Sequence, residues 1–176
     1  MLLDLDLTDR RVVTVGGGPV TARRVAAFLE DGARVTVIAP QVCPQVAAHV
    51  AVGAVEHAAR AWDGPADLEG ACLVHTATGV PAVDTAVRRA AAALGIWAID
   101  ATDAAASPVH VPARGVVPVS GGRLSVAVHA GGHPRRAVAA RDLAVAALTR
   151  AAVDGRLAPA GSRSLDRPSI TARRSA

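Results

Sequence analysis

The stretch from Arg11 to Pro40, RVVTVGGGPVTARRVAAFLEDGARVTVIAP, decides the fold. A β-branched run from Val12 to Val15 leads into three glycines, and a second such run covers Val35 to Ile38. Between them, apolar residues recur at helical spacing, and Gly32 stands where a helix ends. The pattern predicts a strand, a tight turn, a helix and a parallel strand, which together make a βαβ unit.

The glycine turn is typical of a nucleotide site. Gly16 can turn the chain out of the strand, Gly18 lets a ligand approach the backbone, and a helix starting near Pro19 presents free N–H groups to a pyrophosphate. The sequence departs from the dinucleotide fingerprint G-x-G-x-x-G/A at its last position, where Thr21 stands. No acidic residue follows the second strand to hold a ribose 2′-hydroxyl. We predict a bound dinucleotide, with NAD or NADP left open and a purely structural turn as the alternative.

The alternation of strand and helix continues to Ile99. We predict helices at 44–52 and 83–94 and strands at 55–57, 71–76 and 96–99, while residues 2–7 could form an outer strand or an arm. This order predicts an α/β fold, a Rossmann-like doubly wound parallel sheet. Ala77 and Thr78 follow a strand at its carboxyl end, where such sheets bind nucleotides, and are predicted to line the site.

The pattern changes after this point. Short apolar runs cover 109–111, 116–119 and 124–128. Single prolines and one pair of glycines interrupt this stretch, which predicts hairpins, and a long helix is expected at 137–153. We divide the chain into an NAD-binding Rossmann-like domain at 1–112 and a small α+β dimerisation unit, a hairpin and a C-terminal helix, at 113–155. A unit of about 40 residues cannot bury a good core alone, so a homodimer is expected.

Composition limits the remaining possibilities. The segment from Arg156 onward holds five arginines and one acid, Asp166, which accounts for the whole net charge of +4. We interpret residues 156–176 as a disordered tail rich in Arg, Ser and Pro. Few aromatic residues argue against nucleic-acid binding, no apolar run suits a membrane span, and Cys43 and Cys72 lack metal spacing. A cytoplasmic protein without a resident metal is expected.

Four segments carry a specific resemblance. They are GGGPVTARRVAAFLEDGARVTVIAP, LVHTAT, GIWAIDATDAAASPVHVPA and LSVAVHAGGHPRRAVAARD, in unbroken order between about Leu2 and Leu148. Together they resemble the precorrin-2 dehydrogenase/sirohydrochlorin ferrochelatase family, the NAD-dependent module of siroheme synthesis. The resemblance implies a homodimer that oxidises precorrin-2 to sirohydrochlorin with NAD and, in many members, inserts ferrous iron.

The family pattern also implies particular residues. The pyrophosphate turn matches Gly16, Gly17, Gly18, Pro19 and Val20, and the segment near the adenosine matches Pro40 and Gln41. Family members carry a catalytic aspartate in the loop after the last parallel strand, and the ungapped match to that position is Thr102. Threonine cannot serve as that base, so we predict that the neighbouring Asp103 does.

Two alternatives to this assignment stay open. Asp100 and Asp103 could both be turn residues that bond their own backbone. The protein could also be a catalytically impaired module that binds NAD or a tetrapyrrole without turnover.

Substrate contacts are predicted beyond the hairpin. His129 and His133 lie in a segment where the family more often has serine or threonine residues. Neutral imidazole can accept a proton or bind a metal. Arg135 and Arg136 can bind the carboxylates of a tetrapyrrole through paired hydrogen bonds. Exposed loop and helix-end residues without a ligand are the alternative.

Overall fold

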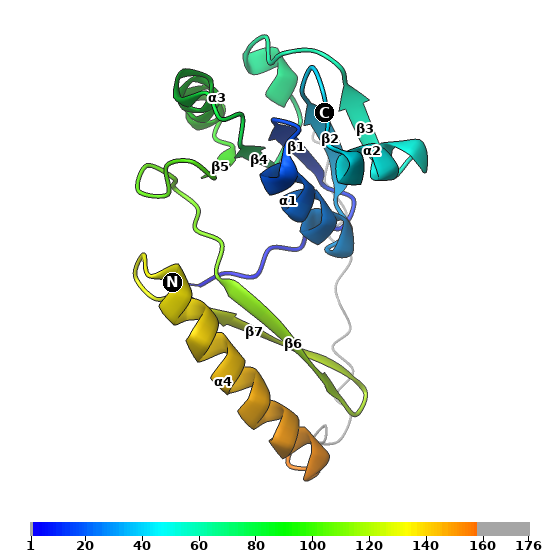
Figure 1. The fold of residues 1–176 in the computed structure, drawn as a ribbon, viewed down its shortest axis with the longest axis vertical. Coiled ribbons are helices and arrows are strands. Elements are labelled where there is room, and N and C mark those ends of the chain that lie inside the picture. The colour runs from blue at the N-terminus through cyan, green and yellow to red at the C-terminus, as the bar shows by residue number, and fades with distance from the viewer. Residues whose placement is uncertain (1, 158–176) are drawn as a thin grey trace, which may run out of the picture. The chain divides into compact units, whose positions relative to one another are not determined.

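The computed structural model describes residues 2–157, and Figure 1 shows its elements. The chain divides between Val111 and Pro112 into two compact units. The tail predicted to be disordered, residues 156–176, lies outside the described residues except for Arg156 and Leu157.

The first unit is built on one parallel sheet. Its strands are β1 (Arg11–Val15), β2 (Arg34–Ile38), β3 (Val55–Ala58), β4 (Leu73–Thr76) and β5 (Trp97–Asp100), and they lie in the order β3-β2-β1-β4-β5. The central strand β1 pairs with β2 on one side and with β4 on the other. The prediction of a doubly wound parallel sheet is confirmed.

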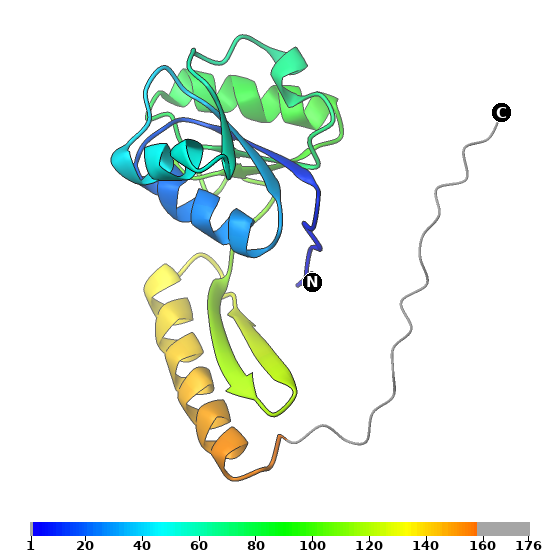
Figure 2. The ribbon, with the colours of Figure 1, turned by 90° about the vertical axis from the view of Figure 1, so that its right-hand side faces the viewer.

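Helices cover both faces of this sheet, as Figure 2 shows. The helices α1 (Pro19–Glu30) and α2 (Pro44–Ala51) pack on one face, and α3 (Pro81–Ala93) packs on the other with the short 3₁₀ helix η1 (Pro65–Leu68). Adjacent residues of β1 alternate between the faces: Val12 belongs to the α1 and α2 core, and Val13 to the α3 core. Because both faces are buried, the strands read as continuous apolar runs.

The hairpin run predicted at 109–111 differs from the structure, and residues 2–7 follow the arm rather than the strand of the two alternatives. Residues 2–7 form no strand; instead Leu7 is buried in the core beside α1 and α2. Val109 and Val111 belong to no hairpin strand and pack against that same core. Cys43 and Cys72 are free and half-buried at its margin.

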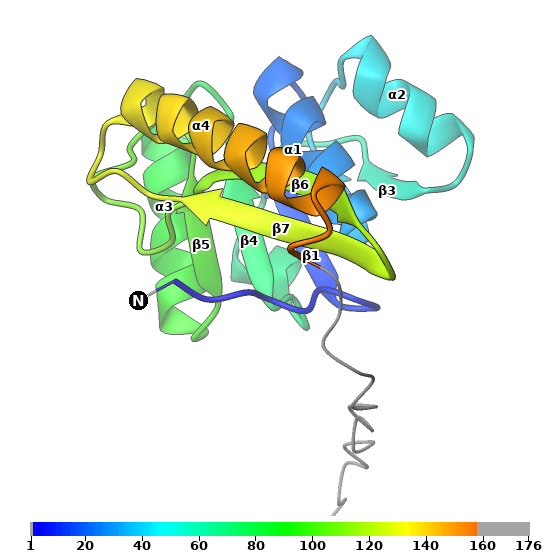
Figure 3. The same cartoon turned by 90° about the horizontal axis from the view of Figure 1, so that it is seen from below.

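The second unit is a hairpin with one helix along it, as Figure 3 shows. The antiparallel strands β6 (Ala113–Val119) and β7 (Gly122–Val128) are followed by α4 (Pro134–Val153), which packs on the hairpin. Among residues 112–157, the buried apolar side chains are Val117 and Ala137. Leu143 on α4 is 74% exposed and Val116 on β6 is 48% exposed. This unit therefore buries little apolar surface by itself.

One buried histidine lies in the first unit. His75 on β4 is fully buried, and within residues 2–157 neither of its ring nitrogens has a hydrogen-bond partner. The edge of its ring packs against Phe28, with 6.4 Å between ring centroids. Burial lowers the pKa of His75 to about 4.

We predict that His75 makes the free energy of unfolding fall as the pH drops from about 6.5 to about 4. In that window the unfolded chain binds a proton that the folded chain excludes, so acid favours unfolding. A pKa difference of this size corresponds to roughly 3 kcal/mol. Urea denaturation across this pH range measures it. The His75→Leu protein should show a flatter dependence, and an equal slope in both proteins would contradict the prediction.

Candidate functional site

The turn after β1 is held by backbone bonds to its neighbours. Gly16 donates its N–H to the carbonyl of Ile38 at 2.9 Å, and the carbonyl of Gly17 accepts from the N–H of Cys43 at 2.7 Å. The helix α1 then begins at Pro19, and no side chain caps its N-terminus. The turn thus leads directly into a helix end whose dipole favours an anion.

The three glycines differ in the space around them. A Cβ on Gly16 would collide with the carbonyl of Ala77, and a Cβ on Gly17 would collide with the carbonyl of Gln41. Gly16 also has a φ of +115°, which side-chain-bearing residues rarely adopt. A Cβ on Gly18 would meet nothing within 4 Å. Gly16 and Gly17 are therefore required by the protein's own packing, whereas Gly18 leaves room for a ligand.

This turn brings several of the predicted cofactor residues together. Gln41 and Ala77, far apart in the sequence, flank the glycines from the ends of β2 and β4. Pro19, Val20 and Pro40 are exposed. The surroundings fit a dinucleotide pyrophosphate, because the turn combines an open backbone position with an uncapped helix N-terminus.

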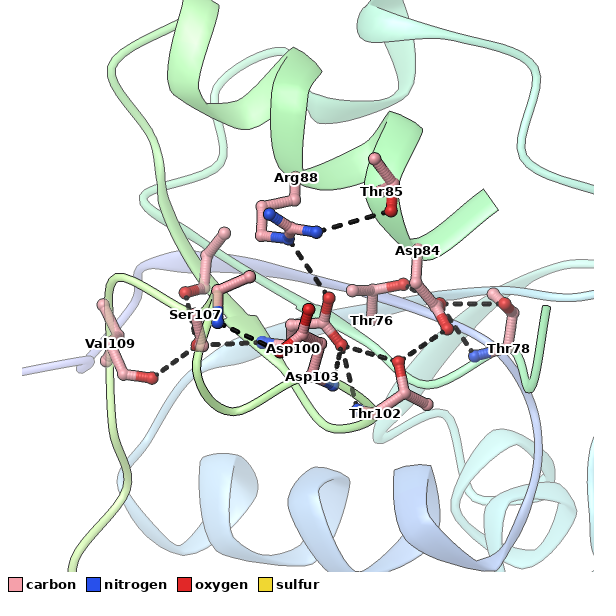
Figure 4. Close-up of polar contacts among 12 residues, drawn as sticks. Thr76, Thr78, Asp84, Thr85, Arg88, Asp100, Thr102, Asp103, Ser107 and Val109 are labelled. Atoms are coloured by element: carbon pink, nitrogen blue, oxygen red, sulfur yellow. Dashed lines mark hydrogen bonds and ion pairs between the residues drawn. The ribbon is translucent and has the colours of Figure 1, made fainter. Parts of the chain in front are cut away.

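Beside this turn, the ends of β4 and β5 hold two buried carboxylates, shown in Figure 4. Asp84, in the first turn of α3, is 1% exposed. It accepts hydrogen bonds from the hydroxyl of Thr76 and from both the N–H and the hydroxyl of Thr78, at 3.1 and 2.8 Å for Thr78. The side chain of Thr78 is therefore committed to holding the loop after β4.

Asp100, the last residue of β5, is the second carboxylate and is 4% exposed. Its Oδ1 accepts from the hydroxyl of Thr102 at 2.8 Å and from the N–H groups of Thr102 and Asp103 at 2.9 and 3.0 Å. Its Oδ2 accepts from Nε of Arg88 at 3.2 Å. Burial raises the pKa of Asp100, but these hydrogen bonds outweigh it and hold the pKa below its ordinary value.

The hydroxyl of Thr102 links the two carboxylates. It lies 2.8 Å from Oδ1 of Asp100 and 3.1 Å from Oδ2 of Asp84. A hydroxyl has one proton to donate, so it can serve either carboxylate but not both at once.

Asp103, the predicted base, has different surroundings. It is exposed, and its Oδ1 accepts from the N–H of Ala106 at 3.1 Å. The backbone-bonding geometry that we considered as an alternative is thus present for both Asp100 and Asp103. The role of Asp103 as the base stays a prediction.

The four predicted substrate residues belong to the second unit. His129 follows β7, His133 precedes α4, and Arg135 and Arg136 lie in the first turn of α4; all four are exposed. The N–H of Gly131 donates to Nδ1 of His129 at 3.4 Å.

Asp84 and Arg88 were missed by the sequence analysis. An acid and an arginine one helical turn apart on an alanine-rich helix look like exposed residues. Both side chains instead face the ends of β4 and β5. The available signal was the position of Asp84 three residues after Pro81, in the first turn of a helix, where a carboxylate is favoured.

Residues 2–157 contain neither a metal-binding cluster nor a membrane-spanning helix. In residues 2–157 no group of three or more His, Cys, Asp or Glu side chains is placed to hold a metal ion. None of the helices in that range has the length and apolar character needed to cross a membrane.

Comparison with known families identifies the first unit. Residues 3–113 match the family model described as "Putative NAD(P)-binding". The siroheme synthase of Methylobacillus flagellatus is 40% identical over 92 residues, which are 52% of this chain and 20% of that protein. The precorrin-2 dehydrogenase of Priestia megaterium is 36% identical over 85 residues, 48% of this chain and 42% of that protein. The chain thus spans less than half of either relative.

A solved structure extends the similarity to the second unit. The structure titled "SirC, precorrin-2 dehydrogenase" matches with a TM-score of 0.69 and 27% identity. The match covers 85% of this chain and 74% of that one. The first unit alone cannot account for this coverage, so the match extends beyond Val111.

The glycines offer a test of the nucleotide site. Gly18→Ala should leave the thermal unfolding temperature nearly unchanged, because its φ of −84° suits alanine and the added Cβ has room. It should weaken NAD binding at least about tenfold, because the Cβ would keep a pyrophosphate away from the backbone. Calorimetric titration with NAD measures the affinity.

Gly16→Ala is the matched comparison. It should lower the unfolding temperature, because its Cβ collides with Ala77 and its φ is unfavourable. NAD affinity equal to that of the wild type in the Gly18→Ala protein would contradict the assignment.

Proposed function

Because the chain belongs to the family of NAD-binding modules found in precorrin-2 dehydrogenases and siroheme synthases, we propose that it oxidises precorrin-2 to sirohydrochlorin with NAD. The observation that carries this proposal is the open backbone at Gly18, beside buried carboxylates at the ends of β4 and β5. Ligands of open α/β sheets bind at this edge. Insertion of ferrous iron into sirohydrochlorin is a second activity to test, with iron as the substrate.

The residues around the glycine turn would hold the cofactor. Backbone N–H groups at the start of α1 suit the pyrophosphate, and the loops after β2 and β4 flank it. NAD, when bound, supplies the acceptor for the hydride that leaves precorrin-2. The residues proposed for its binding are Gly16, Gly17, Gly18, Pro19, Val20, Pro40, Gln41, Ala77 and Thr78.

A carboxylate of the loop after β5 would accept the proton that leaves the substrate with the hydride. Asp103, proposed from the sequence, is exposed and therefore accessible. Asp100 is supported by its surroundings: it ends a strand of the rigid sheet, and four hydrogen bonds hold its carboxylate. Side chains on strands and helices are held more precisely for proton transfer than side chains on loops. We favour Asp100, with Asp103 as the alternative.

Cations in the second unit would bind the substrate's carboxylates. Arg135 and Arg136 lie at the N-terminus of α4, where a positive charge opposes the helix dipole. Helix stability gives no reason for them, which supports a role in binding an anionic tetrapyrrole. His129 and His133 are proposed as neighbouring polar contacts.

The free cysteines agree with a reducing, cytoplasmic location.

The main test is the absorbance of NADH when the purified protein receives NAD and enzymatically generated precorrin-2 without metal. We expect this absorbance to grow as sirohydrochlorin forms. NAD binding without turnover at any pH would contradict the proposal and support a binding module instead. The carboxylates bound within turns at Asp100 and Asp103 are the observation that favours this second function.

Replacing each carboxylate separates the two candidate bases. We expect Asp100→Asn to lower kcat at least about a hundredfold with NAD affinity unchanged, the usual scale for losing a general base. Asp103→Ala should then cost no more than a few-fold. A large loss confined to Asp103→Ala would instead assign the base to Asp103.

The small core of the second unit supports a homodimer. We predict that Leu143→Glu shifts the protein from dimer to monomer, because an exposed leucine on α4 would be buried against a second copy and a buried unpaired carboxylate is costly. Light scattering after gel filtration measures the mass. Val52→Glu, at a position 78% exposed in the first unit, is the control and should leave the dimer intact. A monomeric wild-type protein would contradict this prediction.

A further inference from the structure

Asp100 has a difficulty as a base in the observed geometry. Its two oxygens accept four hydrogen bonds, which is about the capacity of a carboxylate. Two of the four donors are backbone N–H groups of the loop and one is Arg88. These three are held by the fold, so a lone pair can become free with little rearrangement only at the Thr102 hydroxyl.

We propose that Thr102 is a positioning residue for Asp100, and that its hydroxyl controls the basicity of that carboxylate by donating either to Asp100 or to Asp84. This inference rests on the proposed function. Rotation about the Cα–Cβ or Cβ–Oγ bond of Thr102 suffices, because Oδ2 of Asp84 is already 3.1 Å from its oxygen. Donation to Asp100 weakens it as a base, and donation to Asp84 frees one lone pair on Oδ1.

Asp84 is suited to be the second acceptor. Its Oδ1 accepts all three hydrogen bonds from Thr76 and Thr78, while its Oδ2 faces Thr102. The carboxylate is therefore fixed from one side and available on the other. It also ties the loop after β4 to the loop after β5, which keeps the two acceptors of Thr102 in reach.

The other charged groups around Asp100 do not replace Thr102. Two charged groups come from α3. Arg88 donates to Oδ2 of Asp100, and the carboxylate of Asp84 lies on the other side of the Thr102 hydroxyl. From β4, His75 interacts electrostatically with Asp100, but it is neutral above a pH of about 4 because burial lowers its pKa. On the loop itself, Asp103 contributes its N–H, and its carboxylate bonds Ala106.

Two substitutions should move the pKa of Asp100 in opposite directions. Thr102→Val keeps the shape but removes the hydroxyl, so the pKa should rise by about one unit, the usual scale for one hydrogen bond to a charged group. Asp84→Asn should lower the pKa of Asp100. The amide oxygen of the new asparagine would accept from Thr76 and Thr78, so its N–H₂ group would face Thr102 and direct the Thr102 hydroxyl onto Asp100. Loss of the neighbouring negative charge acts in the same direction. General loosening of the loop cannot produce opposite shifts.

The experiment measures that pKa in two ways. Carbon-13 NMR titration of the aspartate carboxyl groups follows Asp100 in the full chain without NAD or substrate, and Asp100→Asn assigns its signal. The acid limb of kcat/KM against pH follows the same pKa in the free enzyme through its effect on activity. Thr102→Ser should restore the wild-type value in both, and Thr36→Val, which removes a hydroxyl bonded to Glu56 elsewhere in the sheet, should change neither.

The outcomes separate this inference from the proposed function. Opposite NMR shifts with a matching acid limb support the switch. An unchanged pKa of Asp100 in Thr102→Val overturns it, whether or not the protein turns over precorrin-2. A shifted NMR pKa together with an unmoved acid limb overturns the role of Thr102 in the reaction. An inactive wild-type protein would refute the proposed dehydrogenase, and the NMR titration would still decide whether Thr102 controls Asp100.

Discussion

The close approach of backbone to backbone at the end of β1 is the constraint on which the first unit depends. Gly16 lies against the carbonyl of Ala77 and Gly17 against that of Gln41, with no room for a Cβ at either position. These contacts fix the ends of β2 and β4 around the central strand. They also leave Gly18 as the open member of the turn, so the packing that holds the sheet together creates the place for a ligand.

Regular local patterns made the fold predictable from the sequence. Continuous β-branched runs identified the buried strands, and glycine and proline identified their ends. The starts of α3 and α4 were placed too late, at Val83 and Ala137, because apolar spacing was followed there instead of proline. Both helices begin at a proline, Pro81 and Pro134, as α1 and α2 also do. A proline at the first helical position loses no hydrogen bond and has a suitable φ, so it was the better guide.

The carboxylate network was beyond sequence reasoning for a physical reason. Its members lie on β4, α3 and the loop after β5, and only the packing of α3 on the sheet brings them together. Asp103 was predicted because it neighbours Thr102, the position that matches the family's aspartate, and such a match does not reveal where a side chain points. In the fold Asp100, at the strand end, is enclosed by donors, while the carboxylate of Asp103 closes a turn onto Ala106. Burial and orientation distinguish these two residues, and neither property can be read from spacing.

The composition of that network argues for a chemical role. The carboxylates of Asp84 and Asp100 are at most 4% exposed and share the hydroxyl of Thr102. Within residues 2–157, the guanidinium bonded to this pair is that of Arg88, which contacts Asp100. Burying such charges is costly, and well-packed apolar residues of similar volume are often at least as stabilising. The position of this polar cluster, at the carboxyl ends of β4 and β5 where open α/β sheets bind their ligands, supports the proton transfer proposed above.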